Sequence, residues 1–383
     1  MSLTEGQYAY VGAGNEFAFN LLRGLYKESG RSMVFSPLSI QYALGMAVNG
    51  AKGETAQEIF DVLGMGEDLV SMNDYCRTLL NQLPATDLGV VLKMADAMVL
   101  NDKYSVLPSY KERINSVFYA PVASLSFEDP DKVKALVNDW CKQNTEGLIP
   151  SLLDSVDPST VCYLMNALYF KGAWSLPFDE DKVKTPFVSL GGKEERFDFL
   201  TKTVALDYAD MGYYRIASVP YGRKQNFVFY VILPKEEKDF EKVLGQIGSA
   251  EWSAALKAMR NDTMLYFSIP EFTIDSNYDL KKVLQGLKVN IAFIDGRADF
   301  SAIVQDQNMY INDVIHKAKI SLDKTGTEGA AATITTMIGI SDNEGGSPVT
   351  PVEFVADHSF VYVIAERSSG AILFAGVFDG PVS

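Results

Sequence analysis

The sequence has few of the side chains that most often carry catalysis. Its 383 residues include only two histidines, three cysteines and three tryptophans. Any histidine-dependent chemistry must therefore use His316 or His358. In the predicted strand "DVIHKAKISLD" His316 alternates with polar neighbours and shares a face with apolar residues, so its side chain points inward. A lone inward histidine is more often a hydrogen-bonded core residue than a catalytic base.

Sequence motifs of enzymes are absent as well. The chain contains no GxSxG elbow, no HExxH pair and no Walker loop. The stretch "GAGNEF" at 12–17 has only two glycines of a dinucleotide-binding loop and follows no predicted strand. The acidic triplet 179–181 is typical of a solvated loop. We therefore expect no enzyme, no catalytic residue, no metal and no cofactor.

Positive charge is scarce, and long apolar runs are missing. Lysine and arginine total 34 against 49 acidic residues, a net charge of −15. Such a surface repels polyanions, so neither nucleic acid nor a heparin-like polyanion is an expected partner. No apolar run approaches the ~18 residues that a membrane span needs. The three cysteines, Cys76, Cys141 and Cys162, lack CxxC spacing, and their odd number excludes a fully paired disulfide framework. We expect buried free thiols.

Nothing in the sequence divides the chain into parts. We find no Pro/Gly/Ser-rich linker, no internal repeat and no low-complexity block. The composition, 47% hydrophobic and 22% charged, is that of a globular protein. We expect one domain over residues 1–383, and a monomer. The start "MSLTEGQYAY" lacks the basic and apolar regions of a signal peptide.

Helix signals are concentrated in the first third of the chain. Ser36 is a good N-cap and Pro37 suits the first helical position, so a helix should run to about Asn49. Further helices are predicted at 15–28, 54–64 and 131–147. Apolar strands are predicted mainly in the remainder, at 90–100, 160–174, 226–236, 358–366 and 371–381. This order favours an α+β fold over an alternating α/β fold.

The stretch "KTGTEGAAATITT" at 324–336 is rich in small residues and fits neither a core nor an ordinary helix. If it enters a sheet as a strand, Glu328 must face solvent. Alternation then places these residues on the inward face: Thr327, Gly329, Ala331, Thr333 and Thr335. All are small and uncharged, so the segment can enter a closed sheet without a large gap, and its glycines permit a chain reversal. The alternative interpretation is a flexible surface loop.

Five stretches together resemble the serpin family. "DKTGTEGAAAT" resembles the serpin hinge, and "NALYFKGAWSLPFDEDKVKTPF" (166–187) resembles the family's central strand and turn. "FSPLSIQYALGMAVNGAKGETAQEI" is similar to its second and third helices. "YDLKKVLQGLKVNIAFIDGRADFSAI" and "DHSFVYVIAERSSGAILFAGVF" are similar to its late helix and C-terminal strands. The resemblance runs from about residue 8 to 379, in the family's order.

This resemblance implies a single α+β domain with three β-sheets, about nine helices and an exposed reactive-centre loop at about 324–350. It also implies a suicide-substrate inhibitor of serine endopeptidases. The target protease cleaves the loop, an acyl-enzyme forms, and residues 326–339 insert into the main sheet and trap the protease. The expected partner is thus a serine protease in a covalent acyl complex, with a papain-like cysteine protease as an alternative. We expect a secreted, extracellular or cell-envelope location, with any signal peptide absent from this chain.

The resemblance also assigns roles to individual residues. A polar "shutter" beneath the sheet centre, where strands part, and a "breach" tryptophan at the insertion point match residues of this chain. The hinge residues are Gly326, Thr327, Glu328, Gly329, Ala330, Ala331, Ala332 and Thr333; the shutter residues are Ser36, Ser39, Asn166 and His316; the breach residue is Trp174.

Family spacing predicts the bond that is cut. Counting fifteen residues from Gly326 gives Ile340–Ser341, and Met337 and Ile338 are alternatives because the segment that follows is longer than usual. An apolar residue before the bond favours chymotrypsin-, elastase- or subtilisin-like targets over trypsin-like ones. A different class of function is a non-inhibitory serpin that acts as a chaperone, carrier or storage protein. Large or charged inward hinge residues would favour that alternative, and this hinge has none.

Overall fold

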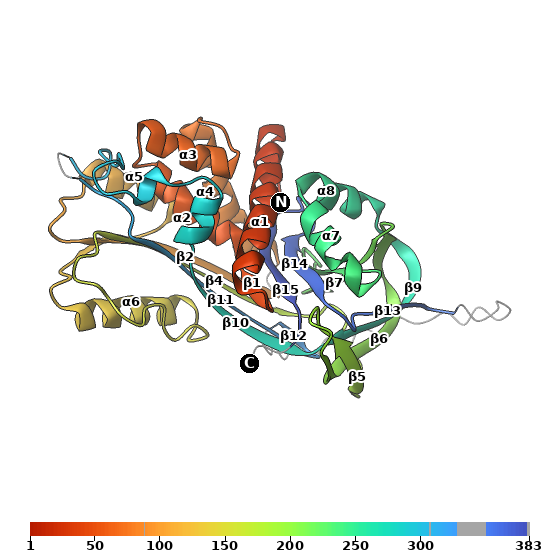
Figure 1. Cartoon of the computed structure of the whole chain (residues 1–383). Helices are drawn as coiled ribbons and strands as arrows, with labels where there is room; N and C mark the ends of the chain where they lie inside the picture. The colour runs from red at the N-terminus through yellow and green to blue at the C-terminus, as the bar shows by residue number, and fades with distance from the viewer. Residues whose placement is uncertain (88, 306–307, 328–349, 381–383) are drawn as a thin grey trace.

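The computed structural model describes residues 1–87, 89–305, 308–327 and 350–380 (Figure 1). These residues form nine α-helices, in agreement with the number expected: α1 Glu5–Ser29, α2 Pro37–Val48, α3 Gly53–Leu63, α4 Leu69–Thr86, α5 Pro108–Phe118, α6 Pro130–Asn144, α7 Phe240–Gln246, α8 Ser249–Ala258 and α9 Lys281–Gly286. A search of the described helices for a segment able to cross a membrane finds none. The three cysteines are buried and carry free thiols, as predicted.

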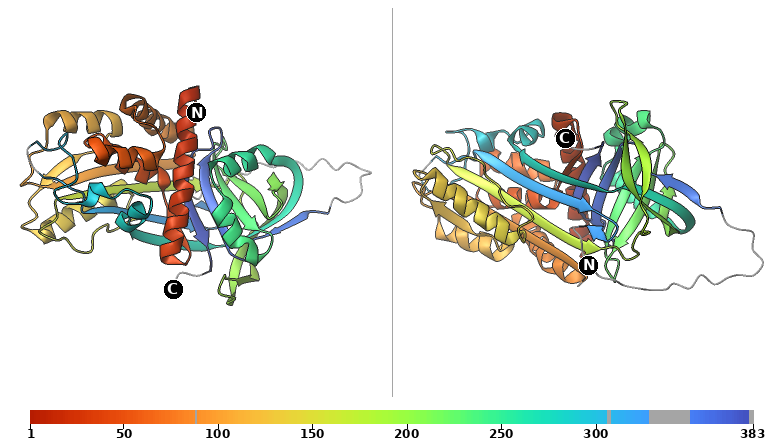
Figure 2. Two further views of the ribbon diagram at one scale, coloured as in Figure 1. Left: turned by 45° about the horizontal axis from the view of Figure 1, so that its top comes forward. Right: turned by 90° about the horizontal axis from the view of Figure 1, so that it is seen from below.

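One sheet has six strands in the order β10–β11–β12–β4–β2–β3. Its long strands run along the length of the molecule (Figure 2). The bounds are β2 Val90–Asn101, β3 Val122–Leu125, β4 Cys162–Ala173, β10 Phe272–Asp279, β11 Asp313–Leu322 and β12 Gly326–Thr327. β4 is antiparallel to β2 and parallel to β11, so the sheet is mixed.

The second sheet has nine strands in the order β1–β15–β14–β8–β7–β6–β9–β13, with β5 also paired to β6. The bounds are β1 Met33–Phe35, β5 Val183–Val188, β6 Glu194–Asp210, β7 Tyr214–Tyr221, β8 Phe227–Pro234, β9 Arg260–Pro270, β13 Val352–Val355, β14 Phe360–Glu366 and β15 Ile372–Phe378. Three sheets were expected, whereas pairing of the described strands gives two. The 17-residue β6 pairs with β5, β7 and β9 and so joins strands that would otherwise form separate sheets.

Local sequence signals account for much of this structure. The Ser36 hydroxyl caps α2 by accepting from the Ser39 N–H, Pro37 occupies the first turn, and the helix ends at Val48. α3 ends before Gly64, whose φ of 63° is left-handed. Helices α4 and α5 were not predicted. α4 carries Pro84 inside it, which is an unfavourable helix signal.

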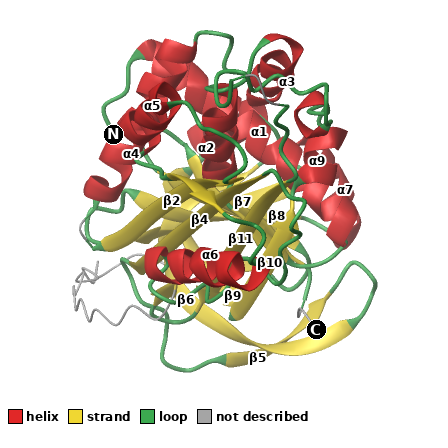
Figure 3. Cartoon of the chain, turned by 90° about the vertical axis from the view of Figure 1, so that its left-hand side faces the viewer, coloured by secondary structure: helices red, strands yellow, loops and turns green. Residues whose placement is uncertain are grey.

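The six-stranded sheet is covered on both faces, by α2 and its neighbours on one side and by α6 on the other (Figure 3). On β4, Leu164, Leu168 and Phe170 join the main core beside α2. Met165 and Ala167 join the smaller cluster beneath α6. Side chains therefore alternate along β4 as in a regular strand, and even-numbered residues of β4 point toward α2.

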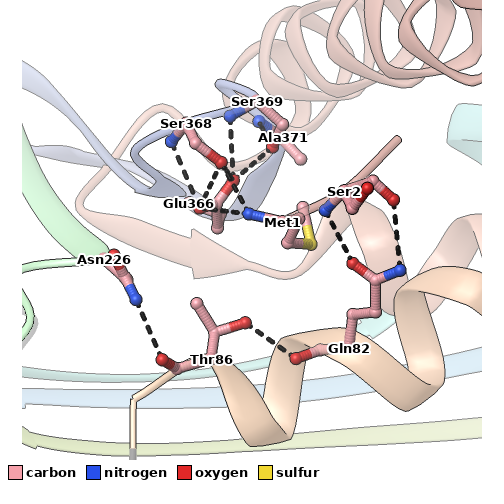
Figure 4. A network of polar contacts seen from close by, with 9 residues as sticks. All are labelled: Met1, Ser2, Gln82, Thr86, Asn226, Glu366, Ser368, Ser369 and Ala371. Atoms are coloured by element: carbon pink, nitrogen blue, oxygen red, sulfur yellow. Dashed lines mark hydrogen bonds and ion pairs between the residues drawn. The ribbon is translucent and has the colours of Figure 1, made fainter. Parts of the chain in front are cut away.

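The first residues of the chain are fixed to the turn between β14 and β15 (Figure 4). The ammonium group of Met1 lies 3.6 Å from the Glu366 carboxylate and donates to the Ser368 hydroxyl at 2.8 Å. Glu366 also accepts from the Ser368 N–H, which closes the turn. The side chain of Gln82 exchanges two hydrogen bonds with the backbone of Ser2. This network ties α4, the N-terminal residues and the β14–β15 turn together.

Candidate functional site

The first two residues of the predicted hinge, Gly326 and Thr327, form a strand of the six-stranded sheet. β12 lies between β4 and β11 at one end of the sheet. Gly326 pairs with Ala173 and Thr327 with Gly172, in antiparallel register, while Thr327 faces Leu322 on the other side. The hinge therefore enters the sheet at the point where β4 and β11 are separated by one strand.

Only glycine fits at position 326. A Cβ atom there would lie 2.1 Å from the carbonyl oxygen of Gly172 and 2.8 Å from Cα of Ala173. Both are backbone atoms of β4, so no rotation of a neighbouring side chain relieves the clash. The glycine at the start of the hinge is required by close approach of two backbones.

Thr327 is 2% exposed and lies on the inward face, where alternation places it. Its hydroxyl is 2.5 Å from the hydroxyl of Tyr221. The Tyr221 ring stacks on Trp174 with 4.4 Å between centroids. Burial raises the pKa of Tyr221, so the phenol is neutral and can donate or accept. Tyr221 is a site residue that the sequence did not reveal, because it is one aromatic residue among several in an apolar strand.

Trp174 fixes the turn that leads into β12. Its indole N–H donates to the carbonyl oxygen of Asp323 at 2.8 Å, and its backbone N–H donates to the carbonyl oxygen of Thr325 at 3.0 Å. The Asp323 carboxylate accepts from the N–H groups of Thr325 and Gly326 at 2.7 and 3.1 Å. The turn is thus closed by Asp323 from within and attached to β4 by Trp174.

Moving along the sheet away from β12, β4 and β11 are first unpaired and are then paired directly with each other. Residues 163–167 of β4 pair directly with 313–317 of β11, in parallel. Between this ladder and β12, no pairing within the described residues joins edge 168–171 of β4 to edge 318–321 of β11. We call this unpaired stretch, between edge 168–171 of β4 and edge 318–321 of β11, the slot. The slot begins where β12 ends.

The four residues expected to form the shutter are brought together below the slot. His316 lies opposite Asn166 in the β4–β11 ladder, and its Nδ1 is hydrogen-bonded to the Asn166 amide oxygen. Its Nε2 accepts from the backbone N–H of Ser36 at 2.9 Å. Since Nε2 accepts, the ring is neutral with its proton on Nδ1, and burial lowers the pKa of His316 to about 3. The Ser36 hydroxyl in turn accepts from the Ser39 N–H.

Neither histidine is placed to act as a base. Both ring nitrogens of His316 are used in the core. In His358, Nδ1 is 2.8 Å from the Asp357 carboxylate and Nε2 is 2.9 Å from the Pro234 carbonyl oxygen. The acidic triplet 179–181 is exposed, as predicted. The described residues contain no group of three or more side chains arranged to hold a metal ion.

The rest of the predicted hinge and both candidate reactive bonds lie outside the described residues. The hinge residues concerned are Glu328, Gly329, Ala330, Ala331, Ala332 and Thr333. The residues of the candidate reactive bonds are Met337, Ile338, Ile340 and Ser341.

Comparison with known proteins places the chain in a family. The family model described as "Serpin (serine protease inhibitor)" matches residues 12–381. Human Serpin B8 is 30% identical over 378 residues, covering 96% of this chain and 98% of the relative. Intracellular coagulation inhibitor 2 of Tachypleus tridentatus is 30% identical over 374 residues, covering 95% and 89%.

Solved structures show the same fold. The native state of the thermophilic serpin tengpin superposes with a TM-score of 0.88 at 24% identity, covering 100% of this chain and 96% of the other. Human thyroxine-binding globulin complexed with thyroxine gives 0.89 at 24% identity, covering 99% and 100%. The matched family is one of protease inhibitors and not of enzymes. The chain belongs to the serpins.

Proposed function

We propose that this serpin is a suicide-substrate inhibitor of serine endopeptidases, which works by inserting its cleaved loop into the six-stranded sheet. The observation that carries this proposal is the seating of β12 between β4 and β11, with the slot directly ahead of it. The hinge is therefore already aligned with the path that a longer inserted strand would follow.

The register of β12 defines that path. Because Thr327 pairs with Gly172 and Leu322, each later residue meets the preceding residue of β4 and of β11. Residues 328–331 then fill the slot. Residues 332–336 reach the ladder between 163–167 and 313–317, and they enter only when that ladder separates.

The balance of hydrogen bonds favours insertion. Nine residues, 328–336, paired on both edges would make roughly 18 ladder bonds, while separating the direct ladder breaks about five. At roughly 1 kcal/mol net for each bond, insertion is favoured by on the order of 10 kcal/mol. The uncleaved fold is then metastable, held by the connection of the loop at its far end.

The inward side chains suit this path. In the same register Thr333 arrives between Asn166 and His316, whose hydrogen bond must break for the strand to pass. A threonine hydroxyl both donates and accepts, so it can satisfy the two groups that it separates. An apolar or charged residue at 333 would leave them unpaired, which costs about 1–3 kcal/mol for each buried group.

Insertion moves the cut end of the loop a long way. β4 has 12 residues, so the inserted strand can extend alongside it for about 40 Å at ~3.3 Å per residue. A protease attached to the cut end as an acyl-enzyme is carried from one end of the sheet to the other. This displacement separates the acyl group from its surroundings in the initial complex and distorts the protease.

We assign the reactive bond to Ile340–Ser341, with Met337 and Ile338 as the alternatives for the residue before the cut. An apolar residue there suits chymotrypsin-, elastase- or subtilisin-like pockets, and it suits the acidic pocket of a trypsin-like enzyme poorly. A papain-like cysteine protease is a further candidate target.

The test is incubation with chymotrypsin, elastase, subtilisin, trypsin and papain, followed by denaturing electrophoresis. We expect a covalent complex with at least one enzyme that has an apolar pocket, and the mass of the released C-terminal peptide locates the bond. The chain cleaved within 337–341 should melt well above the intact chain, because its loop has become a strand. Cleavage without any covalent complex, together with no rise in melting temperature, would instead support the non-inhibitory carrier, chaperone or storage function.

A further inference from the structure

Several buried polar atoms in and beside the predicted shutter have no hydrogen-bond partner among the described residues. The described residues contain five such side-chain atoms, and four of them belong to α2, β2 and β4. They are the Ser39 hydroxyl, the Tyr42 hydroxyl, one carboxyl oxygen of Asp96 and the amide nitrogen of Asn166. Unpaired buried polar atoms are costly and rare in native proteins, so a group of them in one place calls for a specific explanation.

Three of the residues concerned form a row across the sheet. Asp96 of β2 lies directly opposite Asn166 of β4, and Asn166 lies directly opposite His316 of β11. Asp96 also shares its strand face with Met98 and Leu100, which belong to the core beside α2. Directly opposite residues of paired strands project to one face, so Asp96, Asn166 and His316 all point toward α2.

A polar stripe on α2 lies along this row. Ser36, Ser39 and Tyr42 are spaced by three residues, which makes each the neighbour of the next on the helix surface. The Ser36 N–H donates to His316 at one end. At the other end Asp96 is close enough to Tyr42 that its charge would raise the pKa of that phenol.

The spacings of the stripe and of the row agree. Three helical residues rise about 4.5 Å, and adjacent strands lie about 4.8 Å apart. The stripe on α2 and the row across the strands therefore have matching repeats. We call this arrangement of stripe and row the polar layer.

We propose that Asp96 is a neutral carboxylic acid in the closed polar layer, and that its ionisation speeds the parting of β4 from β11. This inference rests on the proposed function, since parting of these strands is the step that insertion requires. The Asn166 amide oxygen is held by His316, so its N–H₂ group remains to be paired. In the structure neither this group nor the Tyr42 hydroxyl is hydrogen-bonded to Asp96, so the carboxyl group has only uncharged neighbours that do not stabilise its ionised form.

Among the described residues, no positive charge faces Asp96 from the elements packed against it. The titratable groups on that side are Tyr42 of α2 and Tyr75 and Cys76 of α4, with the neutral His316 farther along the row. The one cation of β2, Lys93, points to the other face and pairs with Glu146. An ionised Asp96 would thus be a buried charge without a counter-charge, which is strongly unfavourable.

The pH dependence has a definite sign. Burial raises the pKa of Asp96 well above its ordinary value. The closed layer therefore binds the proton more tightly than an opened, hydrated layer. The closed state is most stable at low pH, and it loses this stability as the pH rises from the opened-state pKa to the closed-state pKa. His316 acts in the opposite sense, since its burial disfavours protonation of the closed state at acid pH.

The first test asks whether Asp96 carries its proton, and it uses the intact chain without protease. Asp96→Asn preserves the shape and the donor and acceptor of the neutral acid. The control is Asp102→Asn, the same change at an exposed residue just beyond the end of β2. At pH 6, about two units above the ordinary aspartate pKa, infrared difference spectra should show a carboxylic-acid carbonyl band that Asp96→Asn removes and Asp102→Asn keeps. A spectrum without such a band overturns the proposal.

The second test measures opening through the rate at which the chain takes up a synthetic peptide of residues 327–339. Because the opened-state pKa lies near the ordinary aspartate value of about 3.9, the ratio of the wild-type rate to the Asp96→Asn rate should rise from pH 5 toward pH 9, by up to about tenfold per unit, before it levels off at the closed-state pKa. Taking the ratio removes the contribution of His316. A ratio that stays constant from pH 5 to pH 9, or an equal change in Asp102→Asn, overturns the role in opening. A chain that takes up no peptide in any form refutes the proposed function, and the infrared result still decides the state of Asp96.

Discussion

Replacement of Thr327 by arginine should convert the proposed inhibitor into a substrate. Thr327 is 2% exposed, and its hydroxyl contacts that of Tyr221, whose ring stacks on Trp174. An arginine at this position must either place a guanidinium among these rings or leave the sheet. In both cases β12 no longer pairs normally with β4 and β11. Residue 327 then no longer precedes the rest of the loop into the slot.

The size of the effect follows from two terms. The Thr327–Tyr221 hydrogen bond contributes about 1 kcal/mol, and burying a guanidinium without a partner costs several kcal/mol more. A total of only ~3 kcal/mol in the insertion barrier slows insertion about 150-fold, at ~1.4 kcal/mol per factor of ten. Hydrolysis of the acyl-enzyme then wins the competition, and active protease is released.

The assay is the stoichiometry of inhibition with the best protease of the panel, together with electrophoresis of the products. Thr327→Arg should be cleaved at the unchanged bond, give no stable complex and return full protease activity. Glu328→Arg is the matched control, because alternation puts residue 328 on the outward face. Equal inhibition by the two variants would refute the assignment of faces on which this reasoning depends.

Three further outcomes are expected. Ile340→Arg should shift inhibition toward trypsin-like enzymes with insertion intact; unchanged preference, with cleavage after Met337 or Ile338, would move the reactive bond. Gly326→Ala should unseat β12, because its Cβ would lie 2.1 Å from the Gly172 carbonyl oxygen, and a red-shifted Trp174 emission with a lower melting temperature would report this. Burial lowers the pKa of His316 to about 3. Its contribution to the free energy of unfolding is therefore complete above pH 6.5 and falls as the pH drops toward 3. At pH 5 the loss is about 2 kcal/mol, measured as the wild-type minus His316→Gln difference in free energy of unfolding; equal pH profiles would contradict it.

Features encoded by neighbouring residues could be predicted from the sequence. Ser36 and Pro37 begin α2 where their chemistry requires, and alternation from Glu328 places Thr327 inward, where it is buried. The inward direction of His316 followed in the same way from its strand. Each of these predictions needs only the geometry of one helix or one strand.

Features that depend on contacts between distant segments could not be predicted. Tyr221 joins the site because β7 brings it beside Trp174 and Thr327, and nothing in its own strand marks it. The joining of strands into one nine-stranded sheet depends on which partners β6 finds along its length. Asp96 is marked in the sequence only by its place in the strand, where an acid shares a face with the apolar Met98 and Leu100.

The position of α6 has a consequence for the direction of the conformational change. In the register set by β12, Ile334 would lie between Met165 of β4 and Ile315 of β11, and both of these side chains are buried beneath α6. The outward face is thus not solvent there. α6 must lift to admit the isoleucine and can then settle on it, which buries an apolar side chain worth about 1.5–3 kcal/mol. Withdrawal of the inserted strand would require α6 to lift again and Ile334 to return to water. α6 would therefore make insertion of the strand easier than its withdrawal.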